Sequence, residues 1–279
     1  MSAESNVKNR NPFTAWLAWS NEDSRKTFIV AILLSLVCSL MVATSAVLLK
    51  PAQQANKQLE IQRNILKVAN ISGDFEQDEG ITEQLFNQYI DVRLIDVASG
   101  RYIEHADPVS YDWRGALSDT NNSVAIPAQQ DIAKIKRRPR VLPVYLVKQQ
   151  GQVSRLILPV YGYGLWSTLY GFIALQPDTT TVAGLSFYEH AETPGLGGEV
   201  DNPDWQMKWQ GKQIYDADNN VMLAAVRGHV RPDSDAAAYH VDGLSGASLT
   251  TRGVTHLVQY WLGDQGFGAY LKQFRANPQ

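Results

Sequence analysis

The chain has 279 residues, which is enough for one large domain or two small ones with a buried core. Hydrophobic residues make up 44% and charged residues 19%, so a wholly disordered chain is excluded, and the single cysteine excludes a disulfide-stapled scaffold. The 25 Lys and Arg against 28 Asp and Glu give a net charge of −3, which argues against a nucleic-acid binder because such proteins usually carry a basic face.

The first predicted element is the uncharged apolar run at residues 28–49. Its 22 residues would form a helix of roughly 33 Å, enough to cross a hydrocarbon core of about 30 Å. A buried core helix usually has a polar stripe, and a cleaved signal peptide has a shorter apolar region nearer the start of the chain. We therefore expect a short tail at residues 1–27 and one retained transmembrane helix at residues 28–49, with Cys38 as a small apolar residue inside it.

The charges that flank this span do not set its orientation, because four basic residues lie on each side of it. They are Lys8, Arg10, Arg25 and Lys26 before the span and Lys50, Lys57, Arg63 and Lys67 after it. The short N-terminal tail and the lack of a second apolar span favour an exported C-terminal domain.

After Pro51 the sequence is polar and compatible with a helix up to about residue 68. A partial apolar stripe there, which a juxtamembrane helix would explain, consists of Leu59, Ile61, Ile65, Leu66 and Val68. Five strands are predicted from short runs rich in Val, Ile, Leu, Tyr and Phe, at residues 92–97, 141–147, 153–160, 169–175 and 180–188. This pattern predicts one mixed α+β domain, with a membrane-proximal part at residues 50–140 and a second part at residues 141–279.

The most informative stretch is a turn of small and hydroxyl residues followed by a helix. The helix is predicted from apolar residues at helical spacing, namely Val254, Leu257, Val258, Trp261 and Leu262. We expect it to begin at a Thr250 or Thr251 cap and to end at Gly263. Residues 245–250 then form a turn whose free N–H groups, small residues and positive dipole end suit a phosphate, although an ordinary capped turn is the alternative.

Other catalytic motifs do not fit this turn. Ala247 stands where a Gly-x-Ser-x-Gly elbow needs its second glycine, which weighs against a membrane-tethered serine hydrolase built on Ser245. The sequence has neither a P-loop lysine nor a Gly-x-Gly-x-x-Gly run. None of these motifs therefore assigns a catalytic residue to the turn.

The residues from Asp242 to Ser248, Asp-Gly-Leu-Ser-Gly-Ala-Ser, resemble the Asp-x-x-Ser/Thr-Gly-Ala-Thr signature of domains that carry covalent FMN. Residues 162–172, with Gly-Tyr-Gly-Leu-Trp-Ser and then Leu-Tyr-Gly-Phe, and residues 190–197, His-Ala-Glu-Thr-Pro-Gly-Leu-Gly, are similar to the same family. The run Tyr-Trp-Leu-Gly-Asp-Gln-Gly-Phe-Gly at residues 260–268, with the single span, resembles in particular the family of C subunits of Na+-translocating NADH:quinone reductases. The resemblance covers the anchor and, most densely, residues 155–275.

The resemblance implies that a flavin transferase joins the FMN phosphate to the hydroxyl of Ser248 as a phosphoester, and that residues 141–279 are the FMN-binding part. The family has Thr at this position, and Ser248 keeps the hydroxyl while losing a methyl group. Thr250 and Thr251 are alternative acceptors outside the matching register. The cofactor-binding residues implied are Asp242, Ser245, Gly246, Ala247, Ser248, Leu249, Thr250, Leu165, Trp166, Glu192, Thr193, Pro194, Gly195, Leu196 and Gly197.

Several of these residues have purely structural alternatives. Leu165 and Trp166 would pack near the flavin ring, or Trp166 would be a core residue in a strand turn. Residues 192–197 would line the isoalloxazine, or would form a turn fixed by Pro194 and two glycines. Asp242 would orient the acceptor turn or help the transferase to engage, or it would begin an Asx turn.

The histidines and the basic run carry no specific signal. The histidines, at 105, 190, 229, 240 and 256, have no metal-ligand spacing, so we expect solvated or hydrogen-bonded side chains and no protein-bound metal, with His190 of interest because it opens a motif. Residues 134–140 hold five basic side chains in seven positions, which indicates a solvated face, with a docking role as the alternative.

The resemblance implies an electron-transfer subunit of a membrane complex that oxidises NADH, reduces quinone and moves Na+. Its partners would be the other membrane subunits and a flavin transferase during maturation. The other subunits would hold the nicotinamide and quinone sites, so the resemblance implies no catalytic residue and no complete active site on this chain. The expected location is the bacterial inner membrane, with the C-terminal domain on the periplasmic side. Two alternatives stay open: the corresponding subunit of the related ferredoxin-linked complex, and a flavin-less membrane-anchored sensor or assembly module, which Ser248 in place of Thr favours.

Overall fold

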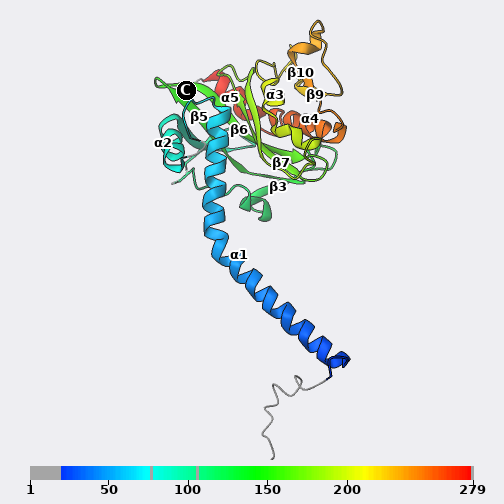
Figure 1. The fold of residues 1–279 in the computed structure, drawn as a ribbon. Helices are drawn as coiled ribbons and strands as arrows, with labels where there is room; N and C mark the ends of the chain where they lie inside the picture. The colour runs from blue at the N-terminus through cyan, green and yellow to red at the C-terminus, as the bar shows by residue number, and fades with distance from the viewer. Residues whose placement is uncertain (1–19, 76–77, 105–106, 278–279) are drawn as a thin grey trace, which may run out of the picture. The chain divides into compact units, whose positions relative to one another are not determined.

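The computed structural model describes residues 20–75, 78–104 and 107–277 of the chain (Figure 1). Lys8, Arg10 and His105 lie outside these described residues. The chain divides into two compact units, residues 1–57 and residues 58–279.

The first unit contains most of a long helix, α1 (Ser24–Val68), which continues into the second unit. Among the described residues α1 is the helix that is long and apolar enough to cross a membrane, and no part of its most apolar window is buried against protein. Leu34 and Leu40, for example, are 62% and 64% exposed. This exposure contradicts the alternative of a buried core helix.

The second unit is built on a six-stranded antiparallel sheet with the order β2-β1-β5-β6-β7-β8. Its strands are β1 (Ile90–Asp96), β2 (Tyr102–Ile103), β5 (Val141–Gln149), β6 (Gln152–Tyr163), β7 (Thr168–Leu175) and β8 (Val182–Glu189). Each of the five predicted strands is present with small shifts at its ends, so the prediction of a mixed α+β domain is confirmed.

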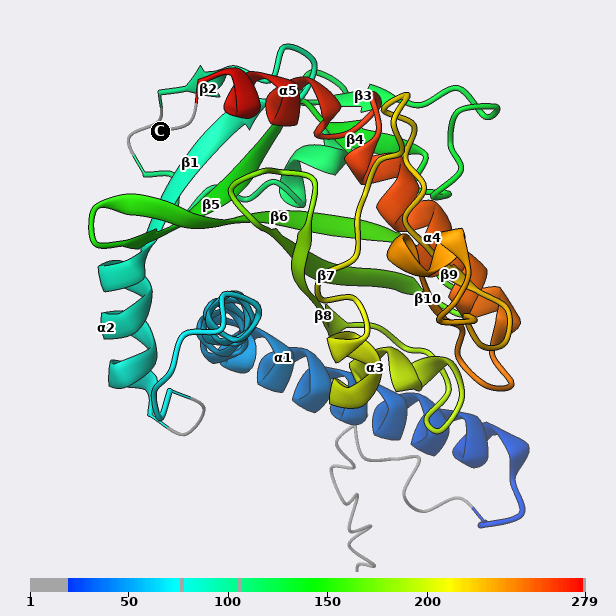
Figure 2. The same cartoon turned by 90° about the horizontal axis from the view of Figure 1, so that it is seen from above.

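The sheet is covered on both faces, and for this reason its strands read as nearly continuous apolar runs (Figure 2). In β5, Val144 and Leu146 belong to one core cluster, whereas Tyr145 and Val147 belong to the other. The last turns of α1 and helix α2 (Glu79–Tyr89) cover the second cluster. The apolar stripe predicted before residue 68 is thus part of the domain core.

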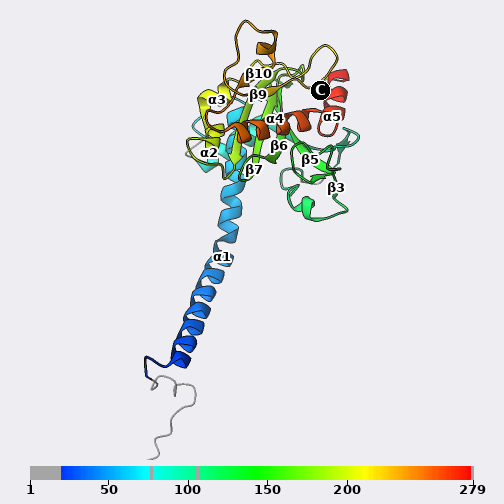
Figure 3. The ribbon, with the colours of Figure 1, turned by 90° about the vertical axis from the view of Figure 1, so that its right-hand side faces the viewer.

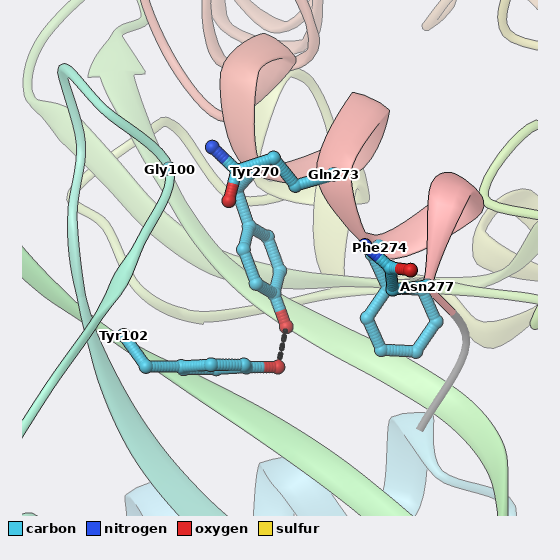
Figure 4. A pocket seen from close by; sticks show the side chains of 6 residues that line it. All are labelled: Gly100, Tyr102, Tyr270, Gln273, Phe274 and Asn277. Atoms are coloured by element: carbon cyan, nitrogen blue, oxygen red, sulfur yellow. Dashed lines mark hydrogen bonds between the residues drawn. The ribbon is translucent and has the colours of Figure 1, made fainter.

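The face opposite α1 and α2 is covered by α4 (Ser248–Leu262) and α5 (Gly268–Ala276). Trp261 of α4 is fully buried, and its Nε1–H donates to the carbonyl of Tyr161 in β6 at 2.6 Å. On α5, the Tyr270 and Tyr102 hydroxyls lie 2.8 Å apart beside a cavity of about 150 Å³ (Figure 4). This pair attaches α5 to strand β2.

The start of α4 differs from the prediction, whereas its end at Gly263 is confirmed. The helix begins at Ser248, after Ala247, so neither Thr250 nor Thr251 is its cap. Both threonine hydroxyls already have other partners, because Thr250 donates to Glu192 and Thr251 accepts from the N–H of Leu244. Thr250 and Thr251 therefore lie inside the first turn of α4, and their hydroxyls bond to other segments of the domain instead of capping the helix.

The remaining short elements surround the sheet. They are β3 (Ser123–Ala125), β4 (Arg137–Pro139), β9 (Ala224–Val226), β10 (His240–Asp242), α3 (Pro203–Met207) and the 3-10 turns at 115–118, 197–201 and 235–238. The parallel pair of β9 and β10 lies beside α4 (Figure 3). The basic run at residues 134–140 is only partly solvated, because Arg137 of β4 donates to the hydroxyl of Ser123 at 2.9 Å.

Candidate functional site

A single buried carboxylate joins the three segments that contain the predicted cofactor-binding residues. Glu192 is 4% exposed, and its Oε1 accepts the N–H groups of Leu165 at 3.0 Å and Trp166 at 2.9 Å. The N–H of Ser167 donates to the same oxygen at 3.2 Å. The hydroxyl of Thr250 donates to Oε2 at 2.6 Å. Residues 162–167, 190–197 and 242–250 therefore form one site although they are far apart in the chain.

Glu192 is ionised in this environment. Burial raises the pKa of its carboxyl, but the hydrogen bonds from Thr250 and from the backbone amides outweigh burial and hold the pKa below its ordinary value of 4.5. The neighbouring backbone leaves no room for side chains. A Cβ at Gly197 would lie 2.6 Å from Thr250 Oγ1, and one at Gly164 would lie 2.7 Å from Glu192 Oε1. Both glycines are needed for this close approach.

The hydroxyl residues in and just after the turn before α4 differ in their exposure to solvent. Gly246 has a φ of +70°, which permits the sharp bend, and the N–H of Ala247 donates to the carbonyl of Leu244 at 3.2 Å. Ser245 and Ser248 are exposed. Thr250 and Thr251, one turn further into the helix, are only 1% and 4% exposed. The predicted acceptor residue is therefore accessible, and the two alternative acceptors are buried.

Large apolar side chains surround this turn without being covered. Trp166 is 66% exposed, so the alternative that it belongs to the core is wrong. Leu249 and Leu196 are 45% and 44% exposed, and a Cβ on Gly246 would lie 2.9 Å from Leu196 Cδ2. Exposed apolar groups close together on a domain surface usually mark a binding site. Leu165 is also exposed, as are Thr193, Pro194 and Gly195.

Asp242 is bonded away from the acceptor turn. Its Oδ2 lies 2.7 Å from Lys208 Nζ and 3.2 Å from His229 Nδ1, and its Oδ1 accepts the N–H of Val230 at 2.7 Å. The hydrogen bond from Lys208 is the main reason why the pKa of this carboxyl lies well below its usual range. The side chain thus fixes the loop that leads into β10 and does not form an Asx turn.

His190 holds the segment of the site that contains Glu192. Its Nε2 lies 2.6 Å from Asp201 Oδ2, and its Nδ1 accepts the N–H of Glu192 at 3.2 Å. The imidazole therefore positions the segment that carries Glu192. Among residues 20–75, 78–104 and 107–277, no group of three or more His, Cys, Asp or Glu side chains could hold a metal ion.

Two residues that contribute to this site, Ser167 and Lys208, were not predicted from the sequence. Ser167 donates its N–H to Glu192, and its Oγ accepts the N–H of Ala191 at 2.7 Å. Ser167 lies within the motif at residues 162–172, so its place in the sequence could have indicated a role in the site. Lys208 lies outside every motif, and nothing in its local sequence indicates the ion pair with Asp242.

The fold and the site define an FMN-binding domain: residues 164–263, which contain all of the site segments except the end of β6, match the FMN-binding domain family. The C subunit of the Na+-translocating NADH-quinone reductase of Pseudomonas aeruginosa is 47% identical over 256 residues, which are 92% of this chain and 98% of that protein. The corresponding protein of Vibrio anguillarum is 43% identical over 93% of this chain and 98% of its own length. This chain belongs to the family of C subunits of the Na+-translocating NADH-quinone reductase.

Solved structures agree with this assignment. The crystal structure of NqrC from Shewanella oneidensis superposes with a TM-score of 0.72 at 33% identity, covering 80% of this chain and 100% of that one. The C subunit of the reductase from Parabacteroides distasonis superposes with a TM-score of 0.60 at 25% identity, covering 80% and 96%. The prediction of an α+β FMN-binding domain behind a single apolar N-terminal helix is confirmed.

Proposed function

We propose that this chain carries one FMN, joined by a phosphoester to Oγ of Ser248, and transfers electrons within a membrane NADH–quinone reductase that translocates Na+. The observation that carries the proposal is the difference in exposure between the hydroxyl groups around the turn. Ser248 is exposed as the first residue of α4, whereas the Thr250 and Thr251 hydroxyls are buried and hydrogen-bonded. Of these three groups, only the hydroxyl of Ser248 is free to form a bond with a phosphate.

The residues around Ser248 fit the two ends of FMN. The first N–H groups of α4 precede the intrahelical bonds, and the positive end of the helix dipole lies beside them, which suits a phosphate. The exposed side chains of Trp166 and Leu196 offer apolar surface to a flavin ring. Gly195 has a φ of +74°, and a Cβ added there would meet no atom within 4 Å, so this position leaves room for a ligand.

When bound, FMN would supply the redox chemistry by accepting and releasing electrons. The residues of this chain hold it in place. Glu192 ties the Leu165–Trp166 segment to Thr250 of α4, so that the apolar contact surface and the attachment point keep a fixed relation. We assign the attachment step to a separate flavin transferase, as the resemblance of residues 242–248 to the flavin-attachment signature implies.

We also propose that residues 28–49 of α1 are a single-pass anchor in the bacterial inner membrane and that the domain lies on the periplasmic side, docked to the other subunits of the complex. A covalent bond would keep the cofactor on a domain outside the compartment that makes FMN. Alkylation of a cysteine introduced at exposed Asn219 tests the side. Labelling in intact spheroplasts is expected, whereas labelling only after lysis would contradict the periplasmic location.

The attachment is tested by peptide mapping of the denatured protein, together with in-gel flavin fluorescence. We expect a mass gain of one FMN minus one water on the peptide that contains Ser248. Ser248→Ala should lose this gain, Ser248→Thr should keep it, and Ser110→Ala, at an exposed serine outside the site, is the matched control. Flavin on Thr250 or Thr251 would refute the assignment. An unmodified mass in the mature chain would favour the flavin-less module instead.

A further inference from the structure

A hollow of about 320 Å³ opens next to the proposed attachment point. Its walls come from the first half of α4, from the end of β6 and from the loop around residue 132. Leu165 and Leu249, which belong to the proposed flavin site, are part of its lining. The hollow and the flavin site are therefore continuous on the surface of the domain.

The lining of the hollow is cationic. Lys134, Arg252 and His256 line it, and no Asp or Glu does. Arg252 and His256 are four residues apart on α4 and so lie on one face of the helix. Both cations line the same hollow as the His256 imidazole, and burial and then their charges lower the pKa of His256. Two fixed positive charges therefore meet here in a chain whose net charge is −3.

Among the described residues, no carboxylate lies within ion-pair distance of Lys134 or Arg252. Both oxygens of Asp131 accept backbone N–H groups, from Ile135 at 2.9 Å and from Lys136 at 2.8 Å. The oxygens of Glu192 accept the backbone and hydroxyl donors described above. Lys134 and Arg252 are both exposed. The hollow is thus open to solvent, and its two cations have no direct ion-pair partner within the described chain.

We propose that this hollow receives Asp or Glu side chains of a neighbouring subunit of the same complex, and that it docks the redox partner against the flavin. The proposal rests on the proposed function, since the partner must approach the cofactor closely to exchange electrons with it. Exposed apolar side chains line the same hollow, including Ile132 at 40% and Leu249 at 45% exposed. Protein interfaces combine exposed apolar side chains with charged ones at their rim, and two unpaired cations favour an acidic partner.

Zero-length cross-linking with a carbodiimide tests the contact directly in membranes that hold the complete complex. The reagent forms an amide between a lysine and a carboxylate only where the two are in contact. We expect Lys134 to be joined to an Asp or Glu of another subunit. The ion pair of Lys148 and Asp91, 2.6 Å apart within this chain, is the internal reference for the reaction. If the reference link forms while Lys134 is unlinked, linked only within the chain, or linked to a lipid phosphate, the proposal is overturned.

Charge neutralisation tests its consequence. In the Lys134→Gln/Arg252→Gln double variant, NADH-driven quinone reduction per flavin should fall about tenfold at low salt and lose most of its salt dependence. The matched control is Arg101→Gln/Arg227→Gln, which removes the same charge from exposed positions outside the hollow. A rate and salt dependence equal to those of the control would overturn the proposal, as would loss of flavin from the double variant. The cross-link is read without flavin, so a flavin-free wild-type chain would refute the proposed function separately.

Discussion

Removing the carboxylate of Glu192 should both destabilise the domain and disconnect the site. In Glu192→Ala, the three N–H groups of residues 165–167 and the Thr250 hydroxyl lose their common acceptor. Each bond to a buried charge is worth about 1.5–3 kcal/mol before the desolvation of the carboxylate is subtracted. Since water can enter the space that alanine leaves, we expect a net loss of about 3 kcal/mol in the free energy of unfolding. Glu192→Gln, which keeps one carbonyl acceptor, should lose about 1–2 kcal/mol.

Urea unfolding of the detergent-solubilised full chain, followed by tryptophan fluorescence, measures these losses. The double variant Glu192→Ala/Thr250→Val closes a thermodynamic cycle, in which a coupling of about 1 kcal/mol or more is expected for two directly bonded side chains. If Glu192→Ala unfolds within about 0.5 kcal/mol of the wild type and the cycle gives no coupling, the carboxylate does not hold the site together.

The pH dependence gives an independent measurement of the same group. The folded pKa of Glu192 lies below its ordinary value of 4.5, so the unfolded chain binds more protons in the interval between the two values. The stabilisation by Glu192 is therefore complete above about pH 4.5 and is lost as the pH falls through the folded pKa. The unfolding free energy of the wild type should decline more steeply with acid in this range than that of Glu192→Gln, and parallel curves would contradict the assignment.

Three further substitutions test other parts of the site and fold. Asp242→Asn removes a partly solvent-screened ion pair with Lys208, so it should lower the free energy of unfolding by about 1 kcal/mol at pH 7. It should also speed hydrogen exchange in residues 227–231, and unchanged exchange would contradict the role of Asp242 in fixing that loop. Tyr270→Phe should cost about 1 kcal/mol, because the half-buried Tyr102 hydroxyl loses its partner, and thermal unfolding with Tyr102→Phe and the double variant should show the coupling. Gly253→Ala places a Cβ 2.6 Å from the Tyr163 carbonyl, so it should destabilise by about 2 kcal/mol despite the better helix propensity of alanine. A higher unfolding temperature for Gly253→Ala would exclude the close contact between α4 and β6.

The sequence predicts the elements whose signals are local. The strands follow from short β-branched and aromatic runs, and the end of α4 follows from Gly263 after the last apolar residue. The predicted start of α4 was wrong. Thr250 and Thr251 look like helix caps in the local sequence, but they bond to residues 58 and 7 positions away. A pattern confined to one helix contains no information about such partners.

The same limit applies to the site. Motif spacing and resemblance pointed to Leu165, Glu192 and Ser248, and the structure brings their segments together. The role of Glu192 as a shared acceptor depends on tertiary contacts across 27 and 58 residues, so local sequence could not give it. The exposure of Trp166 was open for a similar reason: an aromatic residue in a strand turn has the same pattern whether it faces the core or solvent.

The burial of the last turns of α1 decides how a water-soluble form of the domain must be cut. Ile65 and Leu66 have no exposed surface, and the hydroxyl of Ser186 in β8 donates to Asn64 Oδ1 at 3.0 Å. A fragment that starts after residue 68 would leave an open apolar groove along the sheet and would tend to aggregate. A fragment that starts at residue 58 retains the buried end of α1 and omits the apolar run. Its first eleven residues are part of the folded domain and cannot be removed as a linker.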